Sequence, residues 1–204
     1  MALKAMLLGR SAALLCAALL GAGTLASGCS EAAAERPPLE GARLGGPFSL
    51  TDHNGRKFSS ASLDGKYRIV YFGFTYCPDV CPVDLQAIGQ ALRQMEKRDP
   101  ELAAKVQPVF ITVDPERDTP AVMKDYVAAF HPRLIGLTGS PGQIAGVAKA
   151  HGVYFDKQQD KPSDYMVDHS RIALLFGPKG DPIAILPHEQ GADAIAAELR
   201  KWVR

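Results

Sequence analysis

The sequence predicts an α/β domain with a mixed central sheet and helices on both of its faces. Strand-like and helix-like stretches alternate through most of the chain, and an antiparallel hairpin and a final helix come last. Residues 67–75 are aromatic and β-branched with almost no charge, which is typical of a central strand buried on both faces. The 204 residues are 47% hydrophobic and 22% charged, which supplies enough apolar material for one core.

The first 28 residues have the layout of a secretory signal and are not expected to be part of the fold. Lys4 and Arg10 precede a charge-free run of mostly Leu and Ala. Small residues stand directly before Cys29, and this resembles the lipobox of bacterial lipoproteins, where the chain is cut before the cysteine and its thiol is acylated. Residues 1–28 are therefore interpreted as a lipoprotein signal peptide, with Cys29 as the lipidated residue. An uncleaved signal anchor and simple secretion are the alternatives.

Residues 29–46 are rich in Ala, Glu, Pro and Gly, which indicates a flexible tether between the lipid and the domain. The domain itself is expected over 47–204. Every interpretation of the leader places it outside the cytoplasmic membrane, so we expect the periplasmic side of a bacterial membrane, inner or outer. The net charge of +1 comes without a basic patch, which gives no support to a nucleic-acid partner.

The domain opens with a hairpin and continues, after the central strand, into an amphipathic helix. Two short alternating runs, 48–51 and 56–59, flank an Asn-Gly turn signal, which predicts the hairpin. Beyond Pro82, apolar residues recur at helical spacing as far as about Lys97. The central strand is therefore expected to run directly into this helix, with a short loop between them.

The rest of the chain continues the alternation of strand and helix. Thr119 is a candidate N-cap with Pro120 at the first helical position, which predicts a helix over 119–130. Apolar residues at helical spacing predict a final helix over 191–203. The other expected elements are strands at 106–113 and 134–137, a helix at 140–150, an extended segment at 153–156, and a hairpin of 171–176 and 183–186.

Cys77 and Cys81 are the only cysteines in the part of the chain expected to fold, and each is followed by a proline. Because proline restricts the residue before it to extended backbone, neither cysteine is expected inside a helix. Cys81 becomes the candidate helix cap, with Pro82 at the first helical position. A thiol at a helix N-terminus feels the positive end of the helix dipole, so the thiolate is expected to be favoured there.

The spacing of the two cysteines separates the candidate chemistries. Three residues lie between Cys77 and Cys81, whereas a thioredoxin-type redox motif has two, so a disulfide here would close a larger and less constrained loop. Two soft sulfurs with room between them suit Cu(I) well and Zn(II) acceptably. A structural zinc site would need two more ligands, and the sequence holds no second cysteine pair there.

A third metal ligand is expected among the five histidines. His169 stands apart, because it lies at the start of a predicted central strand beside the carboxylate of Asp168. By itself, such a histidine is either a metal ligand or a hydrogen-bonded histidine at a strand edge. The remaining four are expected in surface loops or at a helix end: His53, His131, His151 and His188.

Three segments together resemble the signatures of the Sco/SenC copper chaperones. They are 76–82 (Tyr-Cys-Pro-Asp-Val-Cys-Pro), 113–120 (Val-Asp-Pro-Glu-Arg-Asp-Thr-Pro) and 164–170 (Asp-Tyr-Met-Val-Asp-His-Ser), in the family's order. The resemblance covers roughly residues 46–203. It implies a thioredoxin-like fold with an N-terminal β-hairpin extension, which agrees with the order of elements predicted from the local patterns.

The resemblance also implies one copper ion, as Cu(I), Cu(II) or both, bound through Cys77, Cys81 and His169. Two thiolates and an imidazole suit low-coordinate Cu(I), whereas Cu(II) would favour a further oxygen or nitrogen ligand. The implied function is a membrane-tethered chaperone that delivers copper to a respiratory oxidase, at the dinuclear copper centre of cytochrome c oxidase subunit II. Its implied partners are that subunit, a copper donor protein or thiol–disulfide reductant, and the membrane through the lipid on Cys29.

A thiol–disulfide oxidoreductase is the main alternative, in which Cys77 attacks a partner disulfide and Cys81 resolves the mixed disulfide. The same dithiol could do both, by reducing a target's cysteines and then metallating them. A peroxide-reducing thioredoxin-like protein is a third alternative. The segment 113–120 is expected to support the site, for example by pairing Arg117 with Asp118, rather than to supply a metal ligand.

Overall fold

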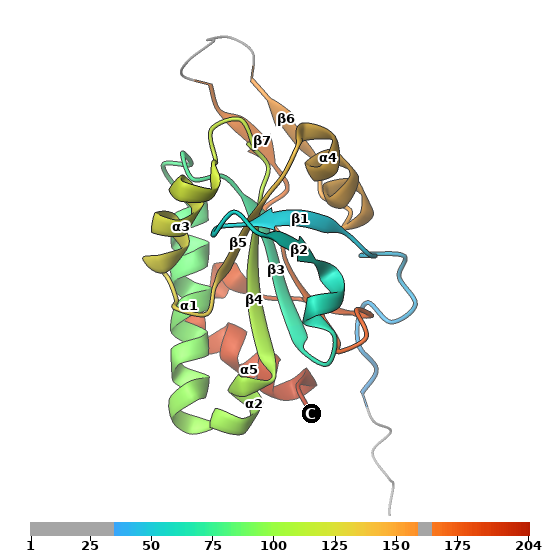
Figure 1. Ribbon diagram of the computed structural model, residues 1–204. Coiled ribbons are helices and arrows are strands. Elements are labelled where there is room, and N and C mark those ends of the chain that lie inside the picture. The colour runs from blue at the N-terminus through green and yellow to red at the C-terminus, as the bar shows by residue number, and fades with distance from the viewer. Residues whose placement is uncertain (1–34, 159–164) are drawn as a thin grey trace, which may run out of the picture. The chain divides into compact units, whose positions relative to one another are not determined.

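The computed structural model describes residues 35–158 and 165–204. The expected signal peptide, 1–28, and the expected lipidation site, Cys29, lie outside the described residues. Residues 36–204 form one compact unit around one hydrophobic core (Figure 1). Within the described part of the chain, we find no helix that combines the length and the hydropathy a membrane crossing requires.

Seven of the described strands form a mixed sheet in the order β2-β1-β5-β4-β3-β8-β9. β3, β4 and β5 run parallel to one another, while β1 and β8 are antiparallel to both of their neighbours. All seven residues of β3 are buried, so the prediction of a central strand is confirmed. The strands are β1 (Ser49–Asp52), β2 (Lys57–Ser59), β3 (Tyr67–Gly73), β4 (Val106–Thr112), β5 (Ile135–Thr138), β8 (Ala173–Phe176) and β9 (Pro182–Ile185).

Helices cover both faces of this sheet, as the sequence predicts. Successive residues of a strand point to opposite faces. The Tyr71 hydroxyl bonds Asp84 of α1 at 2.8 Å, whereas the ring of Phe72 lies 5.4 Å from that of His151 at the end of α4. α1 and α4 therefore cover opposite faces, and α5 packs against α1 (Figure 1). The helices are α1 (Val80–Arg98), α2 (Pro100–Ala104), α3 (Pro120–Ala128), α4 (Pro141–Ala150) and α5 (Ala192–Trp202), with short 3₁₀ turns at Ser60–Leu63 and His188–Gln190.

The end of the expected tether packs against the domain. The Leu39 amide donates to the Ile183 carbonyl at 3.0 Å, and the Gly45 amide donates to the Ala150 carbonyl at 2.7 Å. Leu39 and Leu44 are also packed against the core. Residues 39–45, predicted as part of the flexible stretch 29–46, are therefore held to the domain, because their leucines have apolar surface to bury.

His169 does not begin a strand of the central sheet, and this expectation is wrong. It ends β7 (Val167–His169), which pairs with β6 (Phe155–Lys157) in a separate two-stranded sheet where Phe155 lies opposite His169. The central strand β8 begins only at Ala173. The Ser170 amide donates to the Tyr154 carbonyl at 2.9 Å, which continues the small sheet by one step and separates it from β8.

Two histidines expected in surface loops are instead buried. His131 is 2% exposed and His188 is 6% exposed. Both follow secondary-structure elements in the sequence, but the chain folds each imidazole inward against α1, where it lies near a carboxylate. The prediction that these two histidines lie at the surface is therefore wrong, because the side chain of a loop residue can still point into the interior.

Candidate metal centre

The loop between β3 and α1 presents the two cysteine thiols. β3 ends at Gly73, and the Cys77 amide donates to the Phe74 carbonyl at 3.2 Å, which turns the chain toward the helix. Cys77 is half-buried and Cys81 is completely buried. Both are free thiols, so this part of the structure corresponds to the reduced protein.

Cys81 lies within the first turn of α1, so the prediction that it caps the helix from outside is wrong. The helix begins at Val80 with Asp79 as its N-cap, which makes Cys81 the second helical residue and Pro82 the third. The amides of a first helical turn have no partner within the helix, so a proline there removes no hydrogen bond. The preference of a pre-proline residue for extended backbone is therefore overcome at this position.

The Cys81 thiol is not the favoured thiolate that the helix terminus predicts. Burial raises the pKa of Cys81 to about 12, the hydrogen bond with the Phe74 backbone opposes this rise, and the neighbouring Cys77 adds to it. A helix dipole contributes about 0.3–1 kcal/mol at an exposed site, which is less than one pKa unit. The effect of desolvation on the Cys81 pKa is therefore larger than that of the helix dipole. Deprotonation of this thiol near neutral pH requires a bound metal ion or a partner protein.

Gly73 makes the space that the Cys81 sulfur occupies. A Cβ atom at this position would lie 2.8 Å from the Cys81 Sγ and 3.1 Å from the Phe110 ring. Any larger residue would push the sulfur out of this cradle, because a Cβ contact below 3.0 Å requires an atom to move. The end of β3 is thus shaped to hold a buried thiol directly against the sheet.

His169 meets Cys81 from the far side of the site, 88 residues along the chain. The His169 Nε2 lies 3.4 Å from the Cys81 Sγ, and the Nδ1 lies 3.1 Å from the Ser170 carbonyl oxygen. A carbonyl only accepts, so Nδ1 carries the proton and Nε2 presents its lone pair to the sulfur. Burial lowers the pKa of His169, which favours the neutral imidazole that a metal ligand requires.

The three expected ligands are close to one another but not yet arranged as a closed shell. Cys81 contacts His169, and Cys77 is near enough to raise the pKa of the Cys81 thiol. Within residues 35–158 and 165–204, no three His, Cys, Asp or Glu side chains form a ready-made metal cluster. The donor set of two sulfurs and one imidazole fits copper.

The segment after β4 braces the cysteine loop through hydrogen bonds. Asp118 accepts from the Thr75 amide at 3.0 Å and from the hydroxyls of Thr75 and Thr112, both at 2.6 Å. Arg117 pairs with Asp114 and not with Asp118, so the predicted pairing is wrong. These carboxylates are engaged with hydroxyl, amide and guanidinium partners, as expected for residues that support the loop.

A buried carboxylate under the dithiol was missed by the sequence analysis. Asp84 is completely buried and accepts from the Tyr71 hydroxyl at 2.8 Å. Arg171 binds it with two nitrogens, Nε at 2.8 Å and Nη2 at 2.7 Å, and the His188 Nε2 lies 3.6 Å away. The signal was present in the sequence, since Asp84 stands four residues before Ile88 on the apolar face of the predicted helix.

Residues 36–204 match the family model described as SCO1/SenC. The chain is 43% identical over 166 residues to the mitochondrial protein SCO2 of Saccharomyces cerevisiae, across 78% of this chain and 54% of that protein. The chain thus spans about half the length of the curated relatives it matches.

Solved structures agree with this similarity. The structure of Bradyrhizobium japonicum ScoI with copper bound is 43% identical, with a TM-score of 0.71 over 78% of this chain and 99% of that one. A structure of BsSco, a member of the Sco family of cytochrome c oxidase assembly proteins in which a disulfide switch was identified, is 25% identical, with a TM-score of 0.63 over 81% of this chain and 95% of that one. The thioredoxin-like α/β fold predicted for this chain is confirmed by these neighbours.

Proposed function

The chain belongs to the SCO1/SenC family, and from this premise we propose that it is a copper chaperone that binds one copper ion through Cys77, Cys81 and His169. The contact between the His169 Nε2 and the Cys81 Sγ at 3.4 Å carries the proposal. The His169 Nε2 lone pair and the Cys81 sulfur lie close enough together to bind the same metal ion. The copper-bound relative with a matching fold supports copper as the metal.

The proposed site suits a metal that is carried and released. Two sulfurs and an imidazole satisfy Cu(I) at low coordination number, and Cu(II) could be held with one further oxygen or nitrogen ligand. Of the two cysteines in the described part of the chain, Cys77 is the more accessible, so a partner's ligand could enter beside it before the donor's ligands leave. The cradle at Gly73 holds the other sulfur in place during that exchange.

Delivery to a respiratory oxidase is the proposed task. BsSco belongs to a family of cytochrome c oxidase assembly proteins, which supports an oxidase as the recipient. The proposed acceptor is the dinuclear copper centre of cytochrome c oxidase subunit II, and a copper donor protein or thiol–disulfide reductant would reload or reduce the chaperone. We further propose that a lipid on Cys29 tethers the domain to the periplasmic side of a bacterial membrane.

Thiol–disulfide exchange is a second candidate function, favoured by the different exposure of the two cysteines. Cys77 is half-buried and within reach of a partner disulfide, whereas Cys81 is buried with its pKa raised to about 12. Cys77 would attack one sulfur of the partner disulfide, and Cys81 would then release the partner as a dithiol. The chain would be left with a Cys77–Cys81 disulfide, which a thiol reductant must reduce before the next cycle.

Anaerobic Cu(I) titration of the reduced compact unit, residues 36–204, tests the copper proposal. We expect one copper per chain in the wild type, and an affinity lowered by about tenfold or more in His169→Ala, which corresponds to at least ~1.4 kcal/mol. His53→Gln is the matched control, because His53 lies in the turn between β1 and β2. Zinc competition in the same titration tests the identity of the metal.

Two results would decide between the candidates. Full copper affinity in His169→Ala, together with loss of disulfide reduction in Cys77→Ser, would contradict copper carriage and favour the oxidoreductase. Weakened copper binding in His169→Ala, with the dithiol still oxidisable to a disulfide, would support the chaperone. Cytochrome c oxidase activity in cells that carry His169→Ala then reports whether copper delivery depends on the same histidine.

A further inference from the structure

An ion pair links the helix that carries Cys81 to the segment that carries His169. Asp84 lies three residues after Cys81, in the first turns of α1, and Arg171 lies two residues after His169. Arg171 places Nε 2.8 Å from one carboxylate oxygen of Asp84 and Nη2 2.7 Å from the other. Each member of the pair is therefore separated by only a few bonds of backbone from one of the proposed copper ligands.

The Asp84 end of this pair is fixed. Its side chain is completely buried, and the Tyr71 hydroxyl from β3 donates to it at 2.8 Å. The His188 ring lies on the same carboxylate, with Nε2 at 3.6 Å, and its Nδ1 is 3.0 Å from the Leu186 carbonyl oxygen. Because this carboxylate is buried, accepts from Tyr71 and stands on a helix that packs against α5, it is the more firmly held member of the pair.

The His169 end lies in a small sheet of its own, and the His169 ring packs edge-on against Phe74 with 6.0 Å between the ring centroids. β7 is three residues long and pairs only with the three-residue β6, outside the central sheet. A two-stranded ribbon of this size is marginal in isolation. Before His169, the Tyr165 hydroxyl donates to Asp114 at 2.7 Å, and Lys157 of β6 pairs with Glu116 at 2.5 Å. After His169, the ion pair of Arg171 with the buried Asp84 joins the segment to α1, the helix that carries Cys81.

We propose that the Arg171–Asp84 ion pair is a clamp that holds His169 against Cys81, so that both residues position the copper site without touching the ion. A two-nitrogen, two-oxygen pair fixes orientation as well as distance, because the guanidinium and carboxylate planes must align. Loss of the clamp would let the β6–β7 ribbon move the imidazole away from the sulfur while both cysteines stay in place. This inference rests on the proposed function for its copper readout.

Arg171→Gln, made in the full chain, tests the clamp. We expect the Cu(I) affinity of the reduced protein, measured anaerobically by competition with a chromophoric chelator, to fall by about tenfold, the lower range for loss of a supporting residue around a metal. X-ray absorption at the copper edge should show two sulfur ligands retained and the imidazole contribution weakened. A residue that only stabilised the fold would leave the set of ligands unchanged.

Glu189→Gln is the matched control. Glu189 accepts from Nη1 of the same arginine at 3.0 Å, but its side chain is 63% exposed and it does not touch Asp84. An exposed ion pair contributes little, so this variant should keep wild-type copper affinity and copper spectra. Comparing the two variants separates the effect of the buried Arg171–Asp84 pair from that of the exposed Arg171–Glu189 pair.

A second measurement needs no copper. Carbethoxylation of His169 by diethyl pyrocarbonate, followed by peptide mass spectrometry on the copper-free protein, reports how accessible its Nε2 is. We expect Arg171→Gln to react several times faster than the wild type and Glu189→Gln at the wild-type rate. Arg171→Lys keeps the charge but cannot form the paired contact, so its rate should lie between them.

The outcomes distinguish the clamp from the proposed function. An Arg171→Gln protein with wild-type copper affinity and wild-type His169 reactivity would overturn the clamp. Unchanged copper affinity in His169→Ala would overturn the proposed function, while the carbethoxylation rates would still report on the clamp. If Arg171→Gln does not fold, Arg171→Lys is measured in its place, and wild-type values in both assays would overturn the inference.

Discussion

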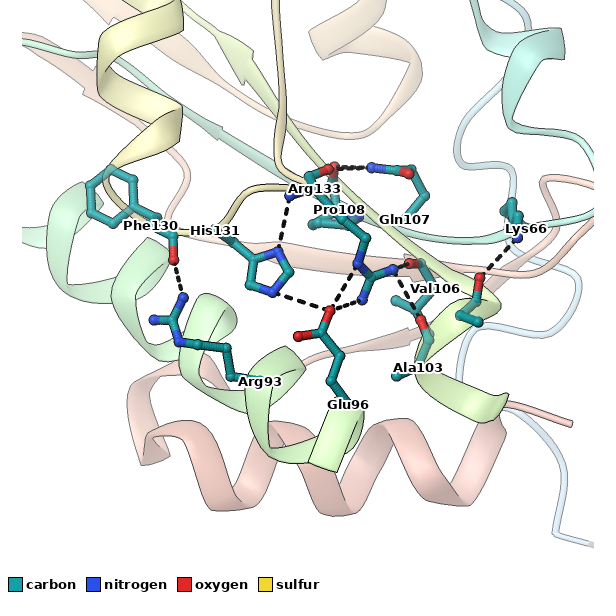
Figure 2. A network of polar contacts seen from close by, with 11 residues as sticks. Lys66, Arg93, Glu96, Ala103, Val106, Gln107, Pro108, Phe130, His131 and Arg133 are labelled. Atoms are coloured by element: carbon teal, nitrogen blue, oxygen red, sulfur yellow. Dashed lines mark hydrogen bonds and ion pairs between the residues drawn. The ribbon is translucent and has the colours of Figure 1, made fainter. Parts of the chain in front are cut away.

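The two ends of α1 are each tied to the rest of the domain by a polar network, and the two networks differ in burial. At the start of the helix, Asp84 is completely buried and its oxygens accept from Tyr71 and Arg171. Toward the end, the Glu96 side chain is 38% exposed, accepts from the Arg133 Nε at 3.0 Å and lies 3.4 Å from the His131 Nε2 (Figure 2).

The far network does not depend on its carboxylate. Figure 2 shows the Arg133 guanidinium reaching past Glu96 to the carbonyls of Ala103 and Val106, at 3.1 and 2.7 Å. Arg93 likewise donates to the Phe130 carbonyl at 2.6 Å. Backbone acceptors and water can replace Glu96, whereas nothing can replace Asp84 in its buried site. The same residue types thus fix a helix end through an exposed pair in one place and, in the proposed clamp, hold a ligand through a buried pair in the other.

The largest expected contrast is in the free energy of unfolding. Asp84→Ala should destabilise the copper-free, reduced protein by about 3 kcal/mol, at the low end for breaking a buried ion pair, because Arg171 is one third exposed and can find water. Glu96→Ala should cost less than about 1 kcal/mol, as for exposed pairs. Urea unfolding measures both. Equal losses in the two variants would contradict the distinction.

Cys81 at one end of α1 and His131 at the other should make stability depend on pH in opposite directions. Burial raises the pKa of Cys81 to about 12, so the unfolded chain releases this proton first and the folded protein loses stability as pH rises from about 8.5 toward 12. We expect this loss to reach about 2 kcal/mol by about pH 10, and to be smaller in Cys81→Ser, when urea unfolding is followed from about pH 8 upward. An identical decline in both proteins would show that other groups cause it.

At the far end the sign is reversed. Burial lowers the pKa of His131, against a smaller opposing effect of Glu96, so the unfolded chain takes up this proton first as pH falls below about 6.5. Stability from His131 is therefore present at neutral pH and lost on acidification. His151 and His169 have pKa values lowered by burial too and add to the same acid-side loss.

The smallest contrast comes from two glycines that make room for a neighbour. Gly73→Ala would place a Cβ 2.8 Å from the Cys81 Sγ, and Gly89→Ala would place one 2.5 Å from the Phe130 carbonyl oxygen. Each should cost about 1–2 kcal/mol through overpacking, with Gly89→Ala partly offset by the helix preference of alanine. Only Gly73→Ala should also weaken Cu(I) binding in the anaerobic titration. Weaker binding in both would mean that any loss of stability disturbs the site.

Local pattern was enough for most of the secondary structure. The Asn-Gly hairpin, the nearly uncharged strand at β3 and the Thr119-Pro120 start of α3 were all predicted and confirmed, because each depends on residues close in sequence. The proximity of His169 to Cys81 was reached only through the family resemblance. No spacing rule joins two residues 88 positions apart.

The amino-acid pattern alone indicates the kind of chemistry available: two thiols with three residues between them, an imidazole downstream, and a strand that leads into a helix. What the tertiary structure decided is the state of those groups. Cys81 was expected outside the helix as a favoured thiolate, but it lies inside the first turn, buried in the space left by Gly73, with its proton retained. In the sequence, Asp84 is one carboxylate among several in a predicted helix. Only the tertiary structure shows that its side chain is buried and accepts hydrogen bonds from Tyr71 and Arg171. Burial and long-range pairing set pKa values and ligand geometry, and both arise only when distant segments fold together.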